Sequence, residues 1–280
     1  MFLAIQNHHS ATIHASVNQS LPLDSLGMPL RYPSPPPLTS ESSSEPPLNN
    51  TRKDHVHHAL AAHGNYRNYY FHRAASIPDA RLSLLFPHRD LFQDHAILDL
   101  GCNAGKLTIE CITHLGAARA VGIDLDDVLI KRAEEGWRKA LQSFEGVEED
   151  CVFLCADFMA PDFWSSFTSR HGEFDTILLL SITKWLHLHH GDEGLVSLFR
   201  DLFKLLPEGG TLVVEPQEWA NYKRAVSKNP SLKPVYKGLK MRPNFEGELK
   251  DVGFRFEKVI EREEGGFSRP LMLWTKPAEG

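Results

Sequence analysis

Short apolar runs alternate with amphipathic segments along most of this chain. The runs have the length of buried strands and lie at residues 96–100, 120–124, 152–156, 176–180 and 211–215. The segments between them show the apolar spacing of helices and lie at residues 105–115, 126–141, 161–169 and 193–206. Strands that are apolar on both faces and are separated by helices predict a parallel sheet with helices on both sides.

The pattern changes after residue 215. A loop-rich, basic stretch extends to Arg242, and a short helix is expected at residues 244–252. Two strands are expected at residues 254–261 and 270–275, and the glycines between them are typical of a hairpin-like connection. We therefore expect five strand–helix steps followed by an antiparallel pair.

The first fifty residues lack this pattern. Residues 21–50 are rich in proline and serine and contain few large apolar side chains, so they bury too little surface to offset the entropy of ordering. We expect a disordered tail at residues 1–54 and one folded domain at residues 55–280. No run approaches the roughly 18 apolar residues of a membrane helix, and no secretory signal is recognisable, so a soluble intracellular protein is expected.

Composition narrows the possible functions. The chain has 280 residues and a formal net charge of −6, so the whole molecule is not an electrostatic partner for nucleic acid. Its four cysteines lie in apolar or helical surroundings, which favours reduced thiols and a reducing compartment. Histidine clusters at residues 55–58 and 187–190 have no cysteines at zinc-site spacing, so no metal is expected.

The first strand leads into a glycine turn with the sequence DLGCNAG at residues 99–105. Asp124 ends the next strand, 19 residues after Gly105, where a carboxylate is placed to accept hydrogen bonds from ribose hydroxyls. A dinucleotide site needs glycine where Asn103 stands, and an ordinary strand-to-helix turn is the other alternative. The Asp-x-Gly-x-x-x-Gly spacing favours a methyl-donor site that includes Asp99 and Gly105.

The third strand also ends in an acid. Asp157 is placed to accept a hydrogen bond from the exocyclic amine of adenine, and Phe158 to lie beside the ring. The alternative interpretation is that Asp157 only caps a helix.

Lys184 and Trp185 follow the fourth strand, in the sequence SITKWLHL at residues 181–188. Ligands of open α/β sheets bind beyond the carboxyl ends of the strands, so these side chains should border the active site. A lysine there suits an anionic acceptor such as phosphate, and the Asn/Asp-Pro-Pro-Tyr/Phe motif of amine methylation is absent. The alternative is a solvated lysine beside a core tryptophan.

Two further segments have features of RNA-binding surfaces. Residues 63–73 alternate aromatic side chains with arginines, although an amphipathic cap helix would have the same composition. Residues 221–242 carry seven lysines and arginines and no acid, which predicts an RNA groove that includes Lys223 and Arg224. A solubilising loop is the alternative for this basic stretch.

These segments together resemble the Bin3-type RNA methyltransferases. The matching motifs are GNY with YY at residues 64–70, DLGCNAG at 99–105, TKW with GDEG at 183–194 and EPQEW at 215–219. The element order is similar to the class I S-adenosylmethionine-dependent methyltransferase fold, a Rossmann-like, mostly parallel seven-stranded sheet. The Bin3-type family includes the methylphosphate capping enzyme of 7SK small nuclear RNA and a relative that methylates 5′-monophosphates.

The resemblance implies a site built around S-adenosylmethionine and an RNA 5′ end. Its implied cofactor contacts are Tyr70, Arg81, Gly101, Cys102, Asn103, Asp124, Leu125, Asp157, Phe158 and Leu180. Its implied acceptor residues are Lys184, Tyr66, Arg67, Glu215, Gln217 and Trp219, with Lys184 and Tyr66 as catalytic residues. The implied partner is a small non-coding RNA, with other ribonucleoprotein subunits as further partners, and the implied state is a nuclear or cytoplasmic monomer, the nucleus being favoured.

The chain departs from the family pattern at two places. The capping enzyme has a long insertion where residues 142–150 are short, and the first fifty residues have no counterpart in the motifs. The favoured function is methylation of the 5′-terminal phosphate, with the γ-phosphate as acceptor. Methylation of a 5′-monophosphate, of ribose or of a small anionic metabolite, and a non-catalytic RNA-binding subunit, remain the alternatives.

Overall fold

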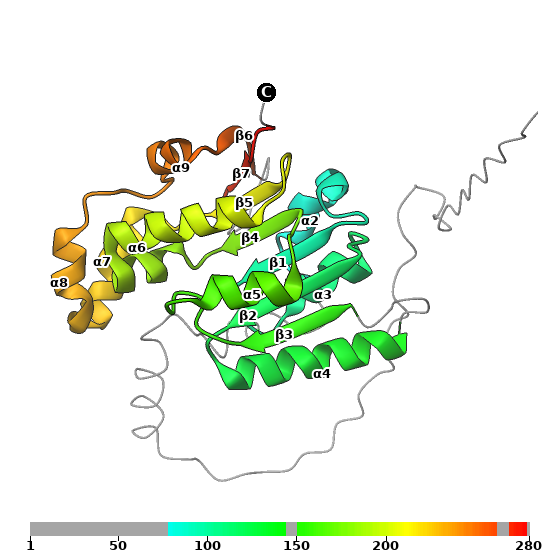
Figure 1. The fold of residues 1–280 in the computed structure, drawn as a ribbon. Helices are drawn as coiled ribbons and strands as arrows, with labels where there is room; N and C mark the ends of the chain where they lie inside the picture. Colours follow the sequence, from blue (N-terminus) through cyan, green and yellow to red (C-terminus); the bar gives the residue numbers. More distant parts are fainter. Residues whose placement is uncertain (1–77, 144–149, 262–268, 279–280) are drawn as a thin grey trace, which may run out of the picture. The chain divides into compact units, whose positions relative to one another are not determined.

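The computed structural model describes residues 78–143, 150–261 and 269–278 (Figure 1). The predictions for the tail at residues 1–54, the aromatic segment at 63–73 and the histidines at 55–58 lie outside the described residues. Within the described part, no helix has the length and apolar character needed to cross a membrane.

A seven-stranded sheet with the strand order β3-β2-β1-β4-β5-β7-β6 organises the fold (Figure 1). Its strands are β1 (Ala96–Leu100), β2 (Arg119–Asp124), β3 (Cys151–Cys155), β4 (Thr176–Leu180), β5 (Thr211–Glu215), β6 (Arg255–Ile260) and β7 (Leu271–Thr275). The first five strands are parallel, and β7 lies between β5 and β6 and is antiparallel to both. This topology confirms the predicted mostly parallel sheet.

Helices cover both faces of this sheet (Figure 1). One face packs against α2 (Leu82–Leu85), α3 (Lys106–Thr113) and α4 (Asp127–Ser143), and the other against α5 (Phe163–His171), α6 (Thr183–Leu205) and α9 (Glu246–Val252). The remaining elements are η1 (Phe86–Leu91), α7 (Trp219–Lys228), η2 (Pro230–Leu232) and α8 (Lys233–Gly238).

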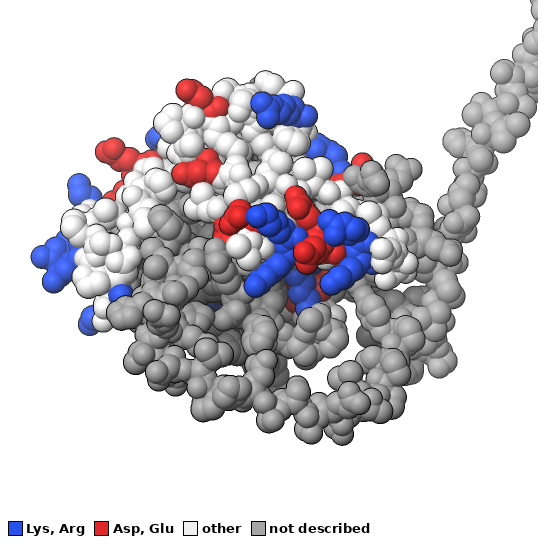
Figure 2. Space-filling model, turned by 90° about the horizontal axis from the view of Figure 1, so that it is seen from below, with Lys and Arg blue, Asp and Glu red and all other residues white. Residues whose placement is uncertain are grey.

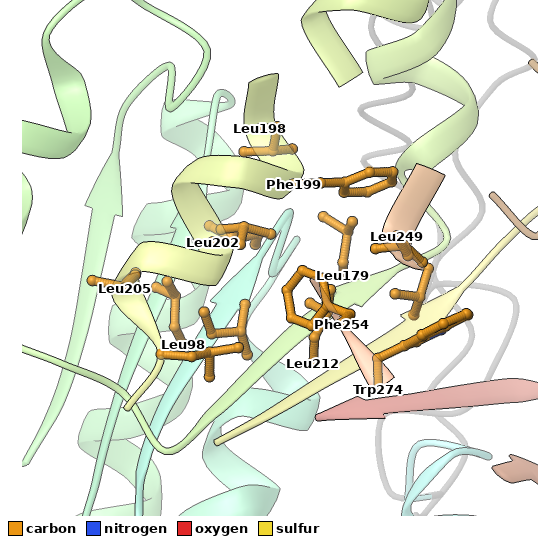
Figure 3. Close-up of a cluster of buried hydrophobic side chains, with 14 of the residues drawn as sticks. Leu98, Leu179, Leu198, Phe199, Leu202, Leu205, Leu212, Leu249, Phe254 and Trp274 are labelled. Carbon is orange, nitrogen blue, oxygen red and sulfur yellow. The ribbon is translucent and has the colours of Figure 1, made fainter. Parts of the chain in front are cut away.

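Alternate residues of each strand form two cores. Leu98 and Leu179 belong to the core beneath α6, together with Phe199 and Trp274 (Figure 3). Ile97 points to the opposite face and packs in the core beneath α3 and α4. Because successive side chains of a strand point to opposite faces, strands that are apolar throughout stabilise both layers at once.

Helix α6 begins at Thr183, whereas the sequence pattern predicted a helix only from residue 193. Gly191 has left-handed φ (+70°) within α6 and interrupts the helical path. Trp185 and Leu188, before this glycine, pack in a third apolar cluster, whereas Leu195, after it, packs in the core on the sheet. The apolar residues before and after Gly191 therefore face different clusters. Because they do not follow one helical period, the sequence pattern did not predict the first part of the helix.

The basic stretch after β5 was predicted to be loop-rich, and this prediction is wrong. Residues 219–238 form α7, η2 and α8. Tyr222 and Ala225 lie one helical turn apart and pack, with Leu232, against Trp185 and Leu188 of α6. The helices form because this small cluster buries one face of each, while the charged residues stay on the other.

Candidate active site

The glycine turn connects β1 to α3 and has unusual backbone conformations. Gly101, Asn103 and Gly105 have φ of +73°, +54° and +69°. Cys102 is buried, and both it and Gly101 donate backbone hydrogen bonds to the Ile123 carbonyl of β2, at 3.1 and 2.8 Å. The turn is therefore fixed against the next strand, with its outer side at the carboxyl edge of the sheet.

The two glycines of this turn have no space for a side chain. A Cβ on Gly105 would lie 2.6 Å from the Ala133 Cβ and 2.6 Å from the Phe153 ring. A Cβ on Gly101 would lie 2.5 Å from Ile182, which follows β4. The close approach of Ile182 places the residues after β4 directly beside the glycine turn.

Asp124 at the end of β2 holds this turn from the side. Its Oδ2 accepts a hydrogen bond from the Asn103 backbone N–H at 2.9 Å, and its Oδ1 accepts one from the Asp126 backbone N–H at 3.0 Å. Burial raises the pKa of this carboxyl, and those backbone N–H groups oppose the rise. Each carboxylate oxygen has a second lone pair, so the donor set fits the two hydroxyls of a ribose.

Asp99 lies beneath the turn and is almost completely buried. Its Oδ2 accepts a hydrogen bond from the Thr108 hydroxyl of α3 at 2.6 Å. Burial raises its pKa to about 6, although the Thr108 hydrogen bond opposes the rise. Asp99 thus links β1 to α3, which fixes the start of the helix behind the turn.

The end of β3 contributes the other predicted adenine contacts. Asp157 is exposed, and its Oδ1 accepts a hydrogen bond from the Met159 backbone N–H at 2.9 Å, so it caps a tight turn and not a helix. Leu125, after β2, is 49% exposed and lies within reach of Cys155, whose thiol donates to the Leu125 carbonyl at 3.5 Å. Phe158 and Leu180 are buried and belong to the two cores.

Ser181 begins the acceptor side of the site, directly after β4. It has left-handed φ (+60°), a conformation that is uncommon for residues other than glycine. Its backbone N–H donates to the Glu215 carbonyl at 3.1 Å, and its carbonyl accepts from the Gln217 side-chain amide. Backbone strain of this kind persists where the surroundings determine the conformation, and it is concentrated at functional sites.

Gln217 is buried and holds the start of α6. Its side-chain oxygen accepts hydrogen bonds from the Lys184 backbone N–H at 3.0 Å and the Thr183 hydroxyl at 3.2 Å. Gln217 was predicted to bind RNA, and its contacts in the structure are with this segment. The amide satisfies N–H groups that lack a partner at the helix start, which fixes the direction in which Lys184 leaves the backbone.

Lys184 is a buried cation with an aromatic neighbour. Its Nζ lies 4.2 Å from the centre of the Trp185 ring, and Trp185 is itself buried. Among the described residues no carboxylate lies within ion-pair distance of this ammonium. The pKa of Lys184 is lowered to about 8, mainly by burial and in addition by the positive charges of Arg269, Arg224 and Lys228. A cation in these surroundings is stabilised by a bound anion.

A second network, formed by Asp79 and Arg81 near the beginning of the described chain, extends to Glu215 on the acceptor side. The Arg81 guanidinium makes a bidentate pair with Asp79, at 2.8 Å for each bond, and its Nη1 lies 3.5 Å from Glu215 Oε2. Glu215 also accepts from the Ser181 hydroxyl. Arg81 was predicted to contact the cofactor, and Glu215 was predicted to contact the acceptor. The structure places these two side chains in contact with each other.

Glu110 of α3 anchors this second network. Both of its carboxylate oxygens accept from the Asp79 backbone N–H, at 3.2 Å each. Burial raises the pKa of Glu110 to about 7, although the Asp79 N–H opposes the rise. The Asp-x-Arg spacing at residues 79–81 is a local sequence signal for the Asp79–Arg81 pair. No local sequence pattern indicates that Glu110 takes part in this network.

The EPQEW motif continues from Glu215 into α7. Trp219 stacks on Tyr236, with ring centres 5.0 Å apart, and the Arg242 guanidinium lies 4.2 Å above the Trp219 ring. Lys223 and Arg224 are exposed on the same helix. Figure 2 shows lysines and arginines gathered at the left edge, where Figure 1 places α8, and mixed charges over α4.

Three residues that were predicted to contact the cofactor or the acceptor, Tyr66, Arg67 and Tyr70, lie outside the described residues. The histidine cluster at 187–190 contains one buried ring, His187, whose Nε2 lies 2.6 Å from Asp192 Oδ1. No set of three metal-ligating side chains is found in the part of the chain that the structure describes. Sequence reasoning missed Ser181 and Arg269, whose importance depends on tertiary contacts.

Comparison with known proteins defines the class of this fold. A TehB-like S-adenosylmethionine-dependent methyltransferase from Corynebacterium glutamicum matches with a TM-score of 0.51 and 15% identity, covering 77% of this chain and 98% of that chain. A model of methyltransferase domains matches residues 97–210. The fold is that of a class I S-adenosylmethionine-dependent methyltransferase.

A more specific match covers the acceptor side. The model of the Bicoid-interacting protein 3 (Bin3) family matches residues 174–276. The U6 snRNA methylphosphate capping enzyme Amus of Drosophila melanogaster is 33% identical over 225 residues, 76% of this chain and 74% of that protein. The human 7SK snRNA methylphosphate capping enzyme is 29% identical over 272 residues, 76% of this chain and 39% of that protein. The chain belongs to the Bin3 family, which confirms the resemblance.

Proposed function

We propose that this chain transfers a methyl group from S-adenosylmethionine to the 5′-terminal phosphate of a small non-coding RNA. The observation that carries the proposal is Lys184, a buried cation beyond the end of β4 that has no carboxylate partner among the described residues. An acceptor phosphate would supply the missing negative charge. Two relatives are known as methylphosphate capping enzymes of U6 and 7SK RNA, and this supports the same acceptor.

The cofactor would lie along the carboxyl edge of β1, β2 and β3. The turn at residues 101–105 would pass over it, Asp124 would accept hydrogen bonds from its ribose, and Leu125 and Asp157 would border its adenine. Arg81 is positioned by Asp79 at the side nearest the acceptor. When bound, S-adenosylmethionine supplies a methyl group on a positively charged sulfur, which is the electrophile of the reaction.

The acceptor needs little activation from the protein. A terminal phosphate is anionic near neutral pH, so its oxygen attacks the methyl carbon without a general base. Lys184 would orient that oxygen, and the rigid link from Gln217 to the Lys184 backbone keeps the ammonium in one place. Catalysis then comes from proximity and from fixed charges that require no rearrangement during transfer.

Methyl transfer to RNAs with different 5′ ends tests the proposal. The full chain is incubated with labelled S-adenosylmethionine and one RNA sequence that carries a 5′-triphosphate, a monophosphate or a hydroxyl. We expect label on the phosphate-bearing RNAs, with the triphosphate preferred, and release of the label by removal of the 5′ phosphates. Label on the hydroxyl RNA would assign ribose or base methylation instead, and no label on any RNA would favour a binding subunit.

The relatives' substrates also suggest where this enzyme works. Both relatives named above are described as acting on small nuclear RNAs, so we place the activity in the nucleus, with the 5′ end of a small RNA as the partner. A monomer is sufficient for the chemistry, because every side chain invoked above comes from one chain.

A further inference from the structure

We infer that Arg269 is a second phosphate-binding side chain of the acceptor site and acts together with Lys184. The inference rests on the proposed function and identifies the chemistry of the acceptor that the site recognises, an anionic 5′ end. Arg269 is not part of any motif described above, and its neighbours in sequence give no indication of a ligand. Its position in the sheet does.

The direction of β7 brings Arg269 to the active edge. The five parallel strands all end at that edge, whereas β7 runs the opposite way and therefore starts there. Val214 of β5 pairs with Met272 of β7, so the residues just before Leu271 lie beyond the end of β5, next to Glu215. An antiparallel last strand thus delivers a residue from the end of the chain to the site.

A hydrogen bond fixes the arginine at this position. The Arg269 Nη1 donates to the Ser181 hydroxyl at 2.8 Å, and this hydroxyl in turn donates to Glu215. Ser181 is held in its left-handed conformation by two hydrogen bonds of its backbone: its N–H donates to the Glu215 carbonyl, and its carbonyl accepts from the Gln217 side-chain amide. The guanidinium is therefore attached to the most constrained residue of the acceptor side, three residues before Lys184.

The positive charges of Lys184 and Arg269 at the carboxyl edge of the sheet favour binding of an anion. Arg269 is the largest charged contributor to the lowered pKa of Lys184, after burial, so the two cations are close enough to repel each other. Asp79 neutralises Arg81 through a bidentate pair, but no described carboxylate pairs with Lys184. A phosphate between Lys184 and Arg269 would relieve their repulsion, and the planar guanidinium matches two phosphate oxygens at once.

Equilibrium binding separates this role from a structural one. The wild-type chain and Arg269→Gln are compared for affinity to one RNA that bears a 5′-phosphate or a 5′-hydroxyl. We expect the wild-type chain to prefer the phosphate end and Arg269→Gln to lose about tenfold or more of that preference, the loss typical of a charge-assisted hydrogen bond. Affinity for the hydroxyl RNA and for S-adenosylmethionine should stay within about twofold.

Two further variants complete the test. Arg269→Lys keeps the charge without the bidentate geometry and should restore part of the preference, and it replaces Arg269→Gln if that variant does not fold. Lys258→Gln removes an exposed cation from the neighbouring strand β6, where Lys258 pairs with Leu273 of β7 and not with the residues at the start of that strand, and it should change nothing. If the wild-type chain prefers the phosphate and Arg269→Gln keeps this preference, the role of Arg269 is refuted while the proposed function stands. If the wild-type chain shows no preference, the proposed function is refuted together with this inference.

Discussion

Gly105 and Gly209 both have positive φ but differ in the space around them. Their φ values are +69° and +79°, so alanine at either position is strained by the backbone. A Cβ on Gly105 would also collide with Ala133 and Phe153, whereas a Cβ on Gly209 would meet nothing within 4 Å. We expect Gly209→Ala to cost about 1–2 kcal/mol of unfolding free energy, and Gly105→Ala to cost about 1–3 kcal/mol more.

Urea denaturation measures both changes, and calorimetric titration measures cofactor binding. Gly105→Ala should weaken S-adenosylmethionine binding because it displaces the turn, and Gly209→Ala should leave this binding unchanged. Equal losses of stability for the two variants would show that the backbone conformation alone, and not the close packing of the turn, requires Gly105.

Lys184→Ala tests the division of the site into a cofactor side and an acceptor side. The ammonium is buried beyond β4, whereas Asp124 is hydrogen-bonded to the glycine turn at the end of β2. We expect kcat to fall about 100-fold or more, as when one charged group that stabilises a transition state is removed, and cofactor affinity to change little. Lys204→Ala removes an exposed lysine of the same helix and should leave both unchanged. Parallel losses of turnover and cofactor affinity would move Lys184 to the cofactor side.

The lowered pKa of Lys184 predicts a pH dependence. A lysine is charged below its pKa, so Lys184 loses its charge as the pH rises through about 8. We expect kcat/KM for RNA to fall above that pH, because this ratio reports the free enzyme, while cofactor affinity stays constant. Steady-state assays between pH 7 and pH 9.5 would measure this; a flat profile would show that the ammonium charge is not needed for acceptor binding.

At the scale of elements, local periodicity predicted the sheet better than it predicted the helices around the acceptor. The five parallel strands were visible because each one is apolar on both faces. The start of α6 was missed because its apolar residues face two different clusters on either side of Gly191. Helix α7 was missed because its buried residues contact Trp185, a partner that is distant in sequence. Tertiary packing, and not intrinsic propensity, determines these two elements.

The interruption of α6 is held by a buried polar contact. Asp192, next to Gly191, lies 2.6 Å from the buried His187 Nε2 and accepts hydrogen bonds from the backbone N–H groups of Lys240, at 2.8 Å, and Met241, at 3.4 Å. Burial lowers the pKa of His187, which keeps the ring neutral, so Nε2–H donates to Asp192 and Nδ1 accepts from Tyr222. This contact ties the end of the basic stretch to α6.

Asp192→Asn should therefore weaken the attachment of α7 and α8. We expect a loss of about 1–3 kcal/mol in unfolding free energy, because the buried His187 loses its charged acceptor. Asp201→Asn breaks an ion pair with the exposed Lys204 on the same helix and should cost less than about 1 kcal/mol. Urea denaturation compares the two variants, and an equal small effect would mean that Asp192 does not hold these elements together.

At the scale of the whole molecule, the site collects residues from both ends of the described chain at one edge of the sheet. The glycine turn, Asp124 and Lys184 were predicted from sequence because each lies at the end of an apolar strand or within a few residues of it. Arg269 precedes its strand, and its relevance appears only when β7 is known to be antiparallel. Ser181 was missed because its left-handed backbone leaves no mark in the residue type. Strand-end chemistry is readable from sequence, whereas the contacts that position it are not.

The asymmetry of charge over the molecule leads to the last prediction. All seven cations of residues 221–242 are exposed, whereas α4 carries mixed charges (Figure 2). Replacing Lys233, Lys237 and Lys240 by glutamine should weaken RNA binding and lower the slope of log K against log salt by about 2, because each phosphate contact with single-stranded RNA contributes about 0.7.

Replacing Lys131, Lys139 and Lys258 changes net charge by the same amount on other surfaces and provides the control. If both triple variants alter the salt slope equally, only net charge matters and these lysines do not form a binding surface. If neither variant alters it, the basic helices serve solubility. A lower salt slope for the Lys233, Lys237 and Lys240 variant alone would show that RNA lies along α8. These cations would then bind the RNA backbone, while Lys184 binds the 5′ end.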